Sequence, residues 1–493
     1  MSQITVSNLT FQYDGSYDNI FENVSFQIDT DWRLGLVGRN GRGKTTFLNL
    51  LRGKYEFGGR ISTDTEFFYF PFTVQNVSAP AIEAVLETIP DAQDWQLLRE
   101  AAKLDIGDDA LYRPFNTLSN GERTKLLLAA MFLKENSFPL IDEPTNHLDE
   151  AGRELLGHYL SKKSGFILVS HDRRFLDVCT DYTLAVNREN IELIRGSFST
   201  WFDEKARRDE SERAENLRLK TESARLTDAA RRTAGWSNKI ERSKIGEHAG
   251  DRGFIGHKSA KMMKRAKNIE ARQLEAAEEK SKLMKNIEEA EDLKLYPLSY
   301  HSARIAQLRD VTIKYAGVPA AADVSFEIMR GDRIVLRGKN GSGKSSVLKL
   351  LLGQHLEYDG DFTVASGLKI SYVPQDTSEL SGAITDFEEQ HCLDPALFRA
   401  ILRKLDFSRV QFEKDLSDYS GGQKKKVLIA KSLCESAHLY IWDEPLNFID
   451  VFSRMQIETL LMRFEPTIIF VEHDAAFADN IATKIVHLGD TPS

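Results

Sequence analysis

The chain has 493 residues, of which 41% are hydrophobic and 28% are charged, an ordinary composition for a globular protein with more than one core. No apolar run approaches the ~20 residues of a membrane-spanning helix, and the N-terminus lacks the basic and apolar regions of a signal peptide. The net charge is −9. The three cysteines are widely separated and form neither a metal-binding nor a disulfide pattern, which argues against a secreted disulfide scaffold. We therefore expect a cytoplasmic protein with no membrane partner.

The first predicted elements are a strand, a glycine-rich loop and a helix. Apolar residues at 32–37 predict a buried strand, and residues 44–51 predict a helix. The loop between them matches the pattern G-x-x-x-x-G-K-[ST], in which backbone N–H groups, a lysine and a hydroxyl hold phosphates and Mg²⁺. ATP and Mg²⁺ are the expected ligands. The candidate contacts are Gly38, Asn40, Gly41, Gly43, Lys44, Thr45 and Thr46.

Two further apolar runs, at 138–141 and 165–169, predict buried parallel strands. Asp142 ends the first run, where a carboxylate suits Mg²⁺. Glu143 follows it and can orient or deprotonate an attacking water. His171 follows the second run and is placed to contact the γ-phosphate. These three residues predict an ATP-hydrolysing site.

The middle of the chain predicts an antiparallel helical hairpin. Residues 201–230 contain neither proline nor glycine, a second helical stretch covers 259–293, and four glycines at 246–256 predict the loop. We expect a first arm of about 40 residues, or ~60 Å at ~1.5 Å per residue.

The tip of this hairpin is basic. Residues 231–268 contain eleven Lys or Arg and three Asp or Glu, a net charge of +8, so the rest of the chain carries −17. Such a segment predicts contact with a polyanion such as RNA, on which aromatic side chains can stack. The alternative is a solvated charged hairpin whose aromatic residues close the loop. The candidate RNA contacts are Trp236, Lys239, Arg242, Lys244, Phe254, Lys258, Lys261, Lys264, Arg265 and Lys267.

The last third of the chain repeats the first at a nearly constant offset. The glycine loop recurs 300 positions on, the Asp-Glu pair recurs 301 positions on as Asp443 and Glu444, and the histidine recurs 302 positions on as His473. Ordered motifs in register predict a tandem ATPase of the α/β P-loop type. The matching phosphate and metal contacts are Gly338, Asn340, Gly341, Gly343, Lys344, Ser345 and Ser346.

A Ser-x-Gly motif precedes each Asp-Glu-Pro, at 119–121 and at 420–422. With the loops, these motifs resemble the ATP-binding cassette (ABC) superfamily over residues 1–200 and 300–493. The resemblance implies a monomer whose two cassettes pair head to tail, so that each ATP lies between one glycine loop and the other copy's Ser-x-Gly motif. Site one would then comprise Lys44, Thr45, Asp142, Glu143, His171, Ser420 and Gly422. Site two would comprise Lys344, Ser345, Gln375, Asp443, Glu444, His473, Ser119 and Gly121.

The resemblance also implies that Tyr13 and Tyr315, 25 and 23 residues before their loops, stack on adenine. It implies these ligands for Mg²⁺: Thr45, Asp142, Ser345, Gln375 and Asp443. The two copies differ, because Phe72 stands where the family has the glutamine that Gln375 provides. The segment 446–450 also departs from the family's usual sequence, which 145–149 keeps. These departures predict that the two sites turn over ATP at unequal rates.

Two cassettes joined by a helical linker resemble the ABC-F translation factors. The segments 235–241, 256–265 and 445–450 resemble its antibiotic-resistance branch, closest to the Lsa/Vga group. The resemblance implies binding to the E site of the bacterial ribosome, with the hairpin reaching P-site tRNA and ribosomal RNA. It implies that ATP binding closes the cassettes, that hydrolysis releases the factor, and that the tip protects against lincosamides, pleuromutilins and streptogramin A.

Two alternatives remain open. One is a housekeeping ABC-F factor that tunes elongation, and the other is the ATPase subunit of a transporter. The predicted domains are a first cassette at 1–200, the linker at 201–296 and a second cassette at 297–493.

Overall fold

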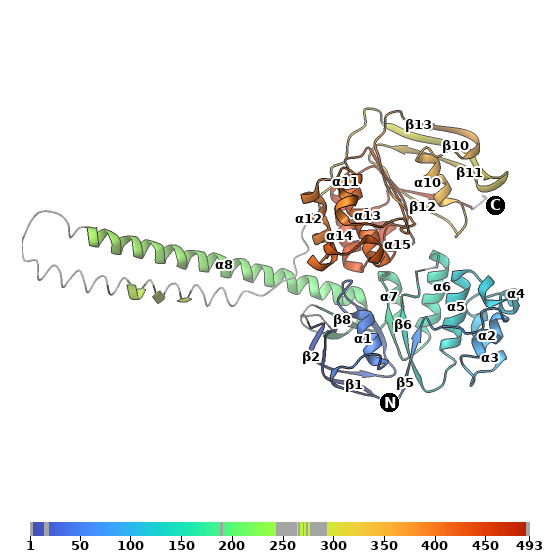
Figure 1. The fold of residues 1–493 in the computed structure, drawn as a ribbon, viewed down its shortest axis with the longest axis horizontal. Coiled ribbons are helices and arrows are strands. Elements are labelled where there is room, and N and C mark those ends of the chain that lie inside the picture. The colour runs from blue at the N-terminus through green and yellow to red at the C-terminus, as the bar shows by residue number, and fades with distance from the viewer. Residues whose placement is uncertain are drawn as a thin grey trace, which may run out of the picture. The chain divides into compact units, whose positions relative to one another are not determined.

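The computed structural model describes residues 3–13, 19–146, 148–187, 191–242 and 293–489, with isolated positions between 264 and 276 (Figure 1). By contacts between residues the chain divides into two units. Residues 1–199 and 290–493 form the first unit, and residues 200–289 form the second. Within the first unit we call the described residues up to 199 the N-terminal cassette and those from 293 the C-terminal cassette.

The N-terminal cassette is built on a six-stranded sheet in the order β5-β6-β7-β3-β8-β9, parallel except for the β8–β9 pair. An antiparallel sheet of three strands has the order β2-β1-β4. The strands are β1 (Gln3–Phe11), β2 (Phe21–Asp29), β3 (Arg33–Val37), β4 (Gly58–Ser62), β5 (Glu66–Phe70), β6 (Ser137–Asp142), β7 (Phe166–Val169), β8 (Tyr182–Val186) and β9 (Ile191–Arg195). The helices are α1 (Lys44–Leu51), α2 (Ala81–Leu86), α3 (Asp94–Ala102), α4 (Asp108–Tyr112), η1 (Phe115–Thr117), α5 (Asn120–Met131), α6 (Glu150–Ser161) and α7 (Arg173–Cys179).

The C-terminal cassette repeats this plan. Its parallel sheet has the order β14-β15-β16-β12-β17, and its antiparallel sheet has the order β11-β10-β13. The strands are β10 (Arg304–Tyr315), β11 (Val318–Met329), β12 (Arg333–Arg337), β13 (Glu357–Val364), β14 (Ile370–Val373), β15 (Leu439–Asp443), β16 (Ile468–Val471) and β17 (Lys484–His487). The helices are α10 (Lys344–Leu351), α11 (Ile384–Gln390), α12 (Pro395–Lys404), η3 (Arg409–Glu413), η4 (Leu416–Asp418), α13 (Gly421–Cys434), α14 (Val451–Phe464) and α15 (Ala475–Ile481).

The parallel sheet of the C-terminal cassette is buried on both faces. On β15, Tyr440 and Trp442 belong to one hydrophobic cluster, whereas Leu439 and Ile441 belong to another. Successive side chains of a strand point to opposite faces, so each face of the sheet has its own core. A strand buried on both faces needs a continuous apolar run, which is the pattern that predicted it. The α/β fold with two tandem cassettes is thereby confirmed.

A single long helix, α8 (Phe198–Arg242), follows the N-terminal cassette (Figure 1). It has 45 residues, which corresponds to ~67 Å at ~1.5 Å per residue. Its first 37 residues lack glycine and proline. Glu204 and Asp209 each precede an arginine, Arg208 and Arg213, by four positions. That spacing stabilises a solvated helix without packing. The second predicted arm, 259–293, lies almost wholly outside the described residues.

The chain reaches the C-terminal cassette before the predicted boundary at 297. Leu293 and Leu295 are 5% and 1% exposed and belong to the same cluster as Trp442. The N–H of Leu298 donates to the carbonyl of Ala437 at 2.8 Å. Position 297 therefore lies inside the packing of this cassette. Among the helices of the described part of the chain, none combines the length and the apolar character needed to cross a membrane.

Replacing Leu295 with alanine should destabilise the C-terminal cassette. Truncating a buried leucine removes apolar contacts and leaves a cavity, at a cost of about 2–5 kcal/mol. We expect the thermal unfolding temperature of Leu295→Ala to fall, measured by circular dichroism. The neighbouring Lys294 is exposed, so Lys294→Ala serves as the control. Equal unfolding temperatures for the two variants would mean that this segment contributes nothing to the core.

Candidate functional site

Three predicted motifs converge because their strands are neighbours. In the N-terminal cassette the glycine loop follows β3, Glu143 follows β6 and His171 lies two residues after β7. The order β6-β7-β3 places these strands side by side and parallel, so their carboxyl ends share one edge of the sheet. The C-terminal cassette has the matching order β15-β16-β12. Open parallel sheets bind their ligands at this edge.

The glycine loops turn sharply into their helices. Gly43 and Gly343, which precede α1 and α10, have φ angles of 91° and 83°. A Cβ atom at Gly43 would lie 2.5 Å from Ile20 Cγ2, and one at Gly343 would lie 2.4 Å from the carbonyl oxygen of Ala320. Only glycine fits this left-handed, crowded turn, which leaves the helix N-terminus open to an anion.

The loop lysine of each cassette is held by its own loop. Lys44 Nζ donates to the carbonyl oxygens of Gly38 at 2.7 Å and Arg39 at 3.2 Å. Lys344 Nζ donates likewise to Gly338 at 2.8 Å and Lys339 at 2.9 Å. Burial lowers the pKa of both lysines. These buried ammonium groups are bonded to carbonyl oxygens and not to carboxylates. The negative charge of a bound phosphate would compensate for the solvation that the ammonium loses on burial.

A small cavity of about 280 Å³ lies at site one. It is lined by the predicted contacts Tyr13, Asn40, Gly41, Gly43, Lys44, Thr45, Thr46, Asp142, Glu143 and His171. The Tyr13 hydroxyl lies 2.8 Å from Thr46 Oγ1, and its ring meets the ring of Tyr55 edge to face at 5.7 Å. The predicted adenine-stacking residue thus stands beside the loop with a second aromatic ring next to it.

The C-terminal cassette contacts the glycine loop of site one through Gly422 of its Ser-x-Gly motif and through Phe448, although neither these residues nor the predicted Ser420 line the cavity. Asn40 Nδ2, in the glycine loop, donates to the carbonyl oxygen of Phe448 at 2.9 Å. A Cβ atom at Gly422 would lie 2.4 Å from that oxygen and 3.4 Å from Asn40 Nδ2. Only glycine fits at 422, because a Cβ atom would collide with the Phe448 carbonyl of its own cassette, and Asn40 of the opposite glycine loop lies at contact distance beside it. Arg39 also pairs with Asp406 across the cassettes.

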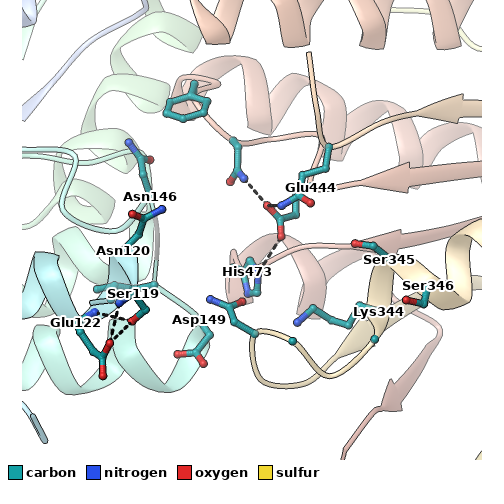
Figure 2. A pocket seen from close by; sticks show the side chains of 18 of the residues that line it. Ser119, Asn120, Glu122, Asn146, Asp149, Lys344, Ser345, Ser346, Glu444 and His473 are labelled. Carbon is teal, nitrogen blue, oxygen red and sulfur yellow. Dashed lines mark hydrogen bonds and ion pairs between the residues drawn. The ribbon is translucent and has the colours of Figure 1, made fainter. Parts of the chain in front are cut away.

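Site two is a larger cavity of about 930 Å³, within the ~300–1,000 Å³ usual for small-molecule sites. Figure 2 shows Ser119 and Asn120 of the N-terminal cassette on one wall and Lys344, Ser345 and His473 of the C-terminal cassette on the other. The predicted contacts in its lining are Ser119, Gly121, Asn340, Gly341, Gly343, Lys344, Ser345, Ser346, Gln375, Glu444 and His473. Tyr315, 44% exposed, is not in this lining.

The two candidate catalytic glutamates have opposite electrostatic environments. Burial, with the adjacent Asp142, raises the pKa of Glu143 to about 8. Both of its carboxylate oxygens are buried without a hydrogen-bond partner among the residues described. His171 Nε2 lies 3.3 Å from Oε1, but burial lowers the pKa of this histidine well below its usual value. Near pH 7 both groups of this pair are therefore largely uncharged.

Glu444 is buried too, yet hydrogen bonds reverse the effect. Gln375 Nε2 and Asn447 Nδ2 donate to its Oε2 at 2.8 and 2.7 Å, and His473 Nε2 lies 3.4 Å from Oε1 (Figure 2). Although burial raises the pKa of Glu444, donation from His473, Gln375 and Asn447 lowers it to about 2. Glu444 is therefore ionised and oriented, as a group that activates water must be.

Both glutamates also hold an unusual backbone conformation. Glu143 has a φ angle of 52° and Glu444 one of 46°, in the left-handed region that costs a non-glycine residue energy. The N–H of Glu143 donates to Val169 at 2.9 Å, and the N–H of Glu444 donates to Val471 at 3.0 Å. These bonds to the neighbouring strand hold the conformation in place and direct each side chain to the carboxyl edge of its own sheet.

The residues proposed for Mg²⁺ fit that ion. Mg²⁺ commonly takes one or two carboxylates together with phosphate oxygens, without a full cage of protein ligands. Thr45 Oγ1 lies 3.3 Å from Asp142 Oδ2, which also accepts from the Tyr69 hydroxyl at 2.9 Å. Asp443 Oδ1 is buried without a hydrogen-bond partner among the described residues. Bound there, the ion would supply charge neutralisation at the phosphates.

Sequence reasoning missed two side chains that touch the carboxylates. Tyr69 is part of an apolar run, and its bond to Asp142 depends on the pairing of β5 with β6. Asn447 follows Glu444 by three residues and donates to it, whereas Asn146, its counterpart 301 positions earlier, lines site two instead. Because both copies have asparagine at this position, the sequence held no signal for the difference.

The predicted RNA contacts are only partly described. Trp236, Lys239 and Arg242 lie in α8, but their side chains are not among those described. Lys264 and Lys267 are helical and exposed. The remaining five, Lys244, Phe254, Lys258, Lys261 and Arg265, lie outside the described residues.

A family model described as "ABC transporter" matches residues 21–146 and 321–447. The chain is 28% identical to the putative ATP-binding protein YdiF of Bacillus subtilis, over 96% of this chain and 78% of the relative. It is 26% identical to the energy-dependent translational throttle protein EttA of Haemophilus influenzae, over 96% of this chain and 89% of the relative. It is also 26% identical to the ribosome protection protein VmlR of Bacillus subtilis, over 99% of this chain and 89% of the relative.

Among solved structures, the fold is similar to that in the complex of archaeal ribosomal stalk protein aP1 and archaeal ribosome recycling factor aABCE1. The TM-score is 0.63 at 18% identity, covering 98% of this chain and 88% of that one. At this identity the likeness supports the tandem fold alone.

The two glutamates should contribute unequally to ATP turnover. Because Glu444 is ionised and held by three donors whereas Glu143 is not, Glu444→Gln should lower turnover about tenfold or more, as general-base loss does. Glu143→Gln should retain more than about half, since a base that is largely protonated adds little. Phosphate release is measured for both, with Glu389→Gln on an exposed position of α11 as control. Equal residual activity in the two site variants would contradict the asymmetry.

Proposed function

The chain belongs to the ABC transporter family and is an ATPase, and from that premise we propose that it is an ATP-dependent factor that binds the bacterial ribosome. The observation that carries this proposal is the helix α8, 45 residues long, which follows one cassette and precedes the other. Relatives named for a translational throttle and for ribosome protection match nearly the whole chain, including this segment. We propose the domain limits 1–200, 201–296 and 297–493 for its cassettes and linker, with Leu293 and Leu295 at the end of the linker packed into the core of the second cassette.

The charge of the linker supports an RNA partner. Its tip at 231–268 carries a net charge of +8 on a chain whose total is −9. RNA offers closely spaced phosphates to such a segment, and the released counterions drive binding. The exposed Lys264 and Lys267 are two of its cations. We propose that the predicted tip residues contact ribosomal RNA and P-site tRNA from the E site.

ATP binding would drive the closed form of the cassettes. A ligand shifts a conformational equilibrium only by its differential affinity for the two states. Ser119 and Gly121 line site two together with Lys344 of the other cassette, so a nucleotide there would contact both cassettes only when they are closed. Binding would therefore favour closure, and hydrolysis would release the factor from the ribosome.

The finer proposal is protection of the ribosome against antibiotics that act at the peptidyl-transferase centre. The linker segments that resemble the Lsa/Vga group support it, as does the likeness to a ribosome protection protein. The drug classes would be lincosamides, pleuromutilins and streptogramin A. A housekeeping role in elongation is the second candidate, and the similar likeness to a translational throttle protein favours it. A transporter subunit remains the third alternative.

The first test is ATP-dependent binding to ribosomes. A Glu143→Gln, Glu444→Gln double variant should keep ATP bound and the cassettes closed. It should pellet with bacterial ribosomes in ATP and not without it. The control lacks the tip, with residues 231–268 replaced by a short glycine-serine loop, and should pellet less. Sedimentation with membranes and not with ribosomes would overturn the proposal in favour of the transporter subunit.

The second test concerns the tip charges. Lys264→Glu with Lys267→Glu should weaken ribosome binding and reduce the slope of log affinity against log salt by about 2, if each lysine neutralises one phosphate. Arg218→Glu with Lys220→Glu, exposed positions of α8 with the same charge change, form the matched control.

In cells that carry the protein, loss of drug protection only with the tip pair would favour the resistance role. Unchanged drug susceptibility with and without the protein would leave the housekeeping role.

A further inference from the structure

We propose that Lys425 is a positioning residue that couples the two ATP sites. It joins α13, whose first turn faces site one, to the two backbone segments that carry Gln375 and Glu444 at site two. The inference concerns ATP turnover by the isolated protein, so it stands independently of the ribosomal partner.

Lys425 is buried in the second turn of α13, with 2% of its surface exposed. Its Nζ donates to the carbonyl oxygen of Pro374 at 2.8 Å and to that of Asp443 at 3.4 Å. Pro374 directly follows β14 and Asp443 ends β15, and these strands are parallel neighbours. One ammonium thus bonds the carboxyl ends of two adjacent strands.

The two carbonyls immediately precede the side chains that act at site two. Gln375 follows Pro374, Glu444 follows Asp443, and the two side chains are joined by a hydrogen bond of 2.8 Å. Fixing both backbones limits how far Gln375 and Glu444 can move relative to each other. A displacement of ~1 Å in such a constellation can cost ~100-fold in rate.

The first turn of the same helix faces site one. Ser420 caps α13 by accepting from the N–H of Gln423, and Gly422 packs against the Phe448 carbonyl and Asn40 of the opposite glycine loop. Gly422 and Lys425 are three residues apart, only ~4.5 Å along the helix axis. Because a helical turn moves as one body, a shift of the first turn at site one displaces the Lys425 backbone too.

The surroundings of Lys425 explain why a buried ammonium is retained there. Burial lowers its pKa to about 8, and the nearby carboxylates of Glu472, Asp443 and Glu444 oppose that effect. Loss of the amine would leave the Pro374 and Asp443 carbonyls without this donor. A buried lysine costs folding energy, which favours a functional reason for keeping it.

Among the described residues of the N-terminal cassette, no lysine makes the corresponding link. The position equivalent to Lys425, 301 residues earlier, is Thr124 in α5, whose hydroxyl is far shorter than a lysine side chain. That cassette also has Phe72 in place of Gln375, and the carboxylate of its Glu143 has no hydrogen-bond partner among the described residues. The proposed coupling therefore runs through α13 of the C-terminal cassette and not through α5.

The test uses Glu143→Gln protein, in which site two supplies the turnover. Lys425→Met, which keeps the length of the side chain but removes its donors, should lower kcat about tenfold or more and leave KM for ATP within about twofold. Lys425→Arg, which keeps a cation that donates, should restore part of kcat. Lys431→Met, in the same helix and paired with Glu435 at 2.9 Å, is the control and should change neither constant. Thermal unfolding of each variant reports its folding.

The link to site one is tested by adding Ser420→Ala, which alters the first turn of α13. In Glu143→Gln protein that keeps Lys425, Ser420→Ala should lower kcat at site two. In Glu143→Gln protein that also carries Lys425→Met, Ser420→Ala should change log kcat by less than about half as much. Full additivity of the two changes would overturn the coupling. An unchanged kcat, a change in KM alone, or an equal loss in Lys431→Met would overturn the positioning role.

Discussion

The whole arrangement depends on the carboxyl edge that adjacent parallel strands share. Motifs that are separated by about a hundred residues meet only because β6, β7 and β3 lie side by side, and the same holds for β15, β16 and β12. A parallel sheet presents this edge when its central strands are packed on both faces, as β15 is, which is why β15 and β16 are apolar along almost their whole length. The chemistry thus follows from sheet topology: the glycine loop, the acidic pair and the histidine occupy positions that this strand order makes neighbours.

Although the two cassettes have the same topology, they differ in whether hydrogen bonds stabilise the buried, ionised glutamate. Desolvation disfavours an ionised carboxylate, and only donors can offset it. Glu444 has donors from three segments of the chain, which lower its pKa to about 2, whereas Glu143 lacks them and its pKa rises to about 8. Two sites with the same glutamate can therefore differ in the charge of that glutamate because of the residues around it. Substitutions around it suffice.

The sequence predicted the elements and motifs well because their signals are local. Buried strands, glycine loops and the N-terminal part of α8 follow from periodicity and composition alone. Contacts that depend on packing were not predictable. Lys425 lies in a run of three lysines that favours an exposed basic face, yet it is 2% exposed, because α13 packs over the ends of β14 and β15. Tyr69 reaches Asp142 only through strand register, and no pattern within β5 indicates it.

The start of α8 has a mechanical consequence. The N–H of Ser199 donates to Asp177 Oδ1 of α7 at 2.9 Å, so the long helix begins on the helix that follows His171 and Asp172. A helix of this length amplifies angle into distance: a tilt of ~5° in its first turn would move a point ~67 Å along its axis by ~6 Å. Small rotations of α7, which begins directly after His171 and Asp172, would thereby become movements of several ångströms along the helix.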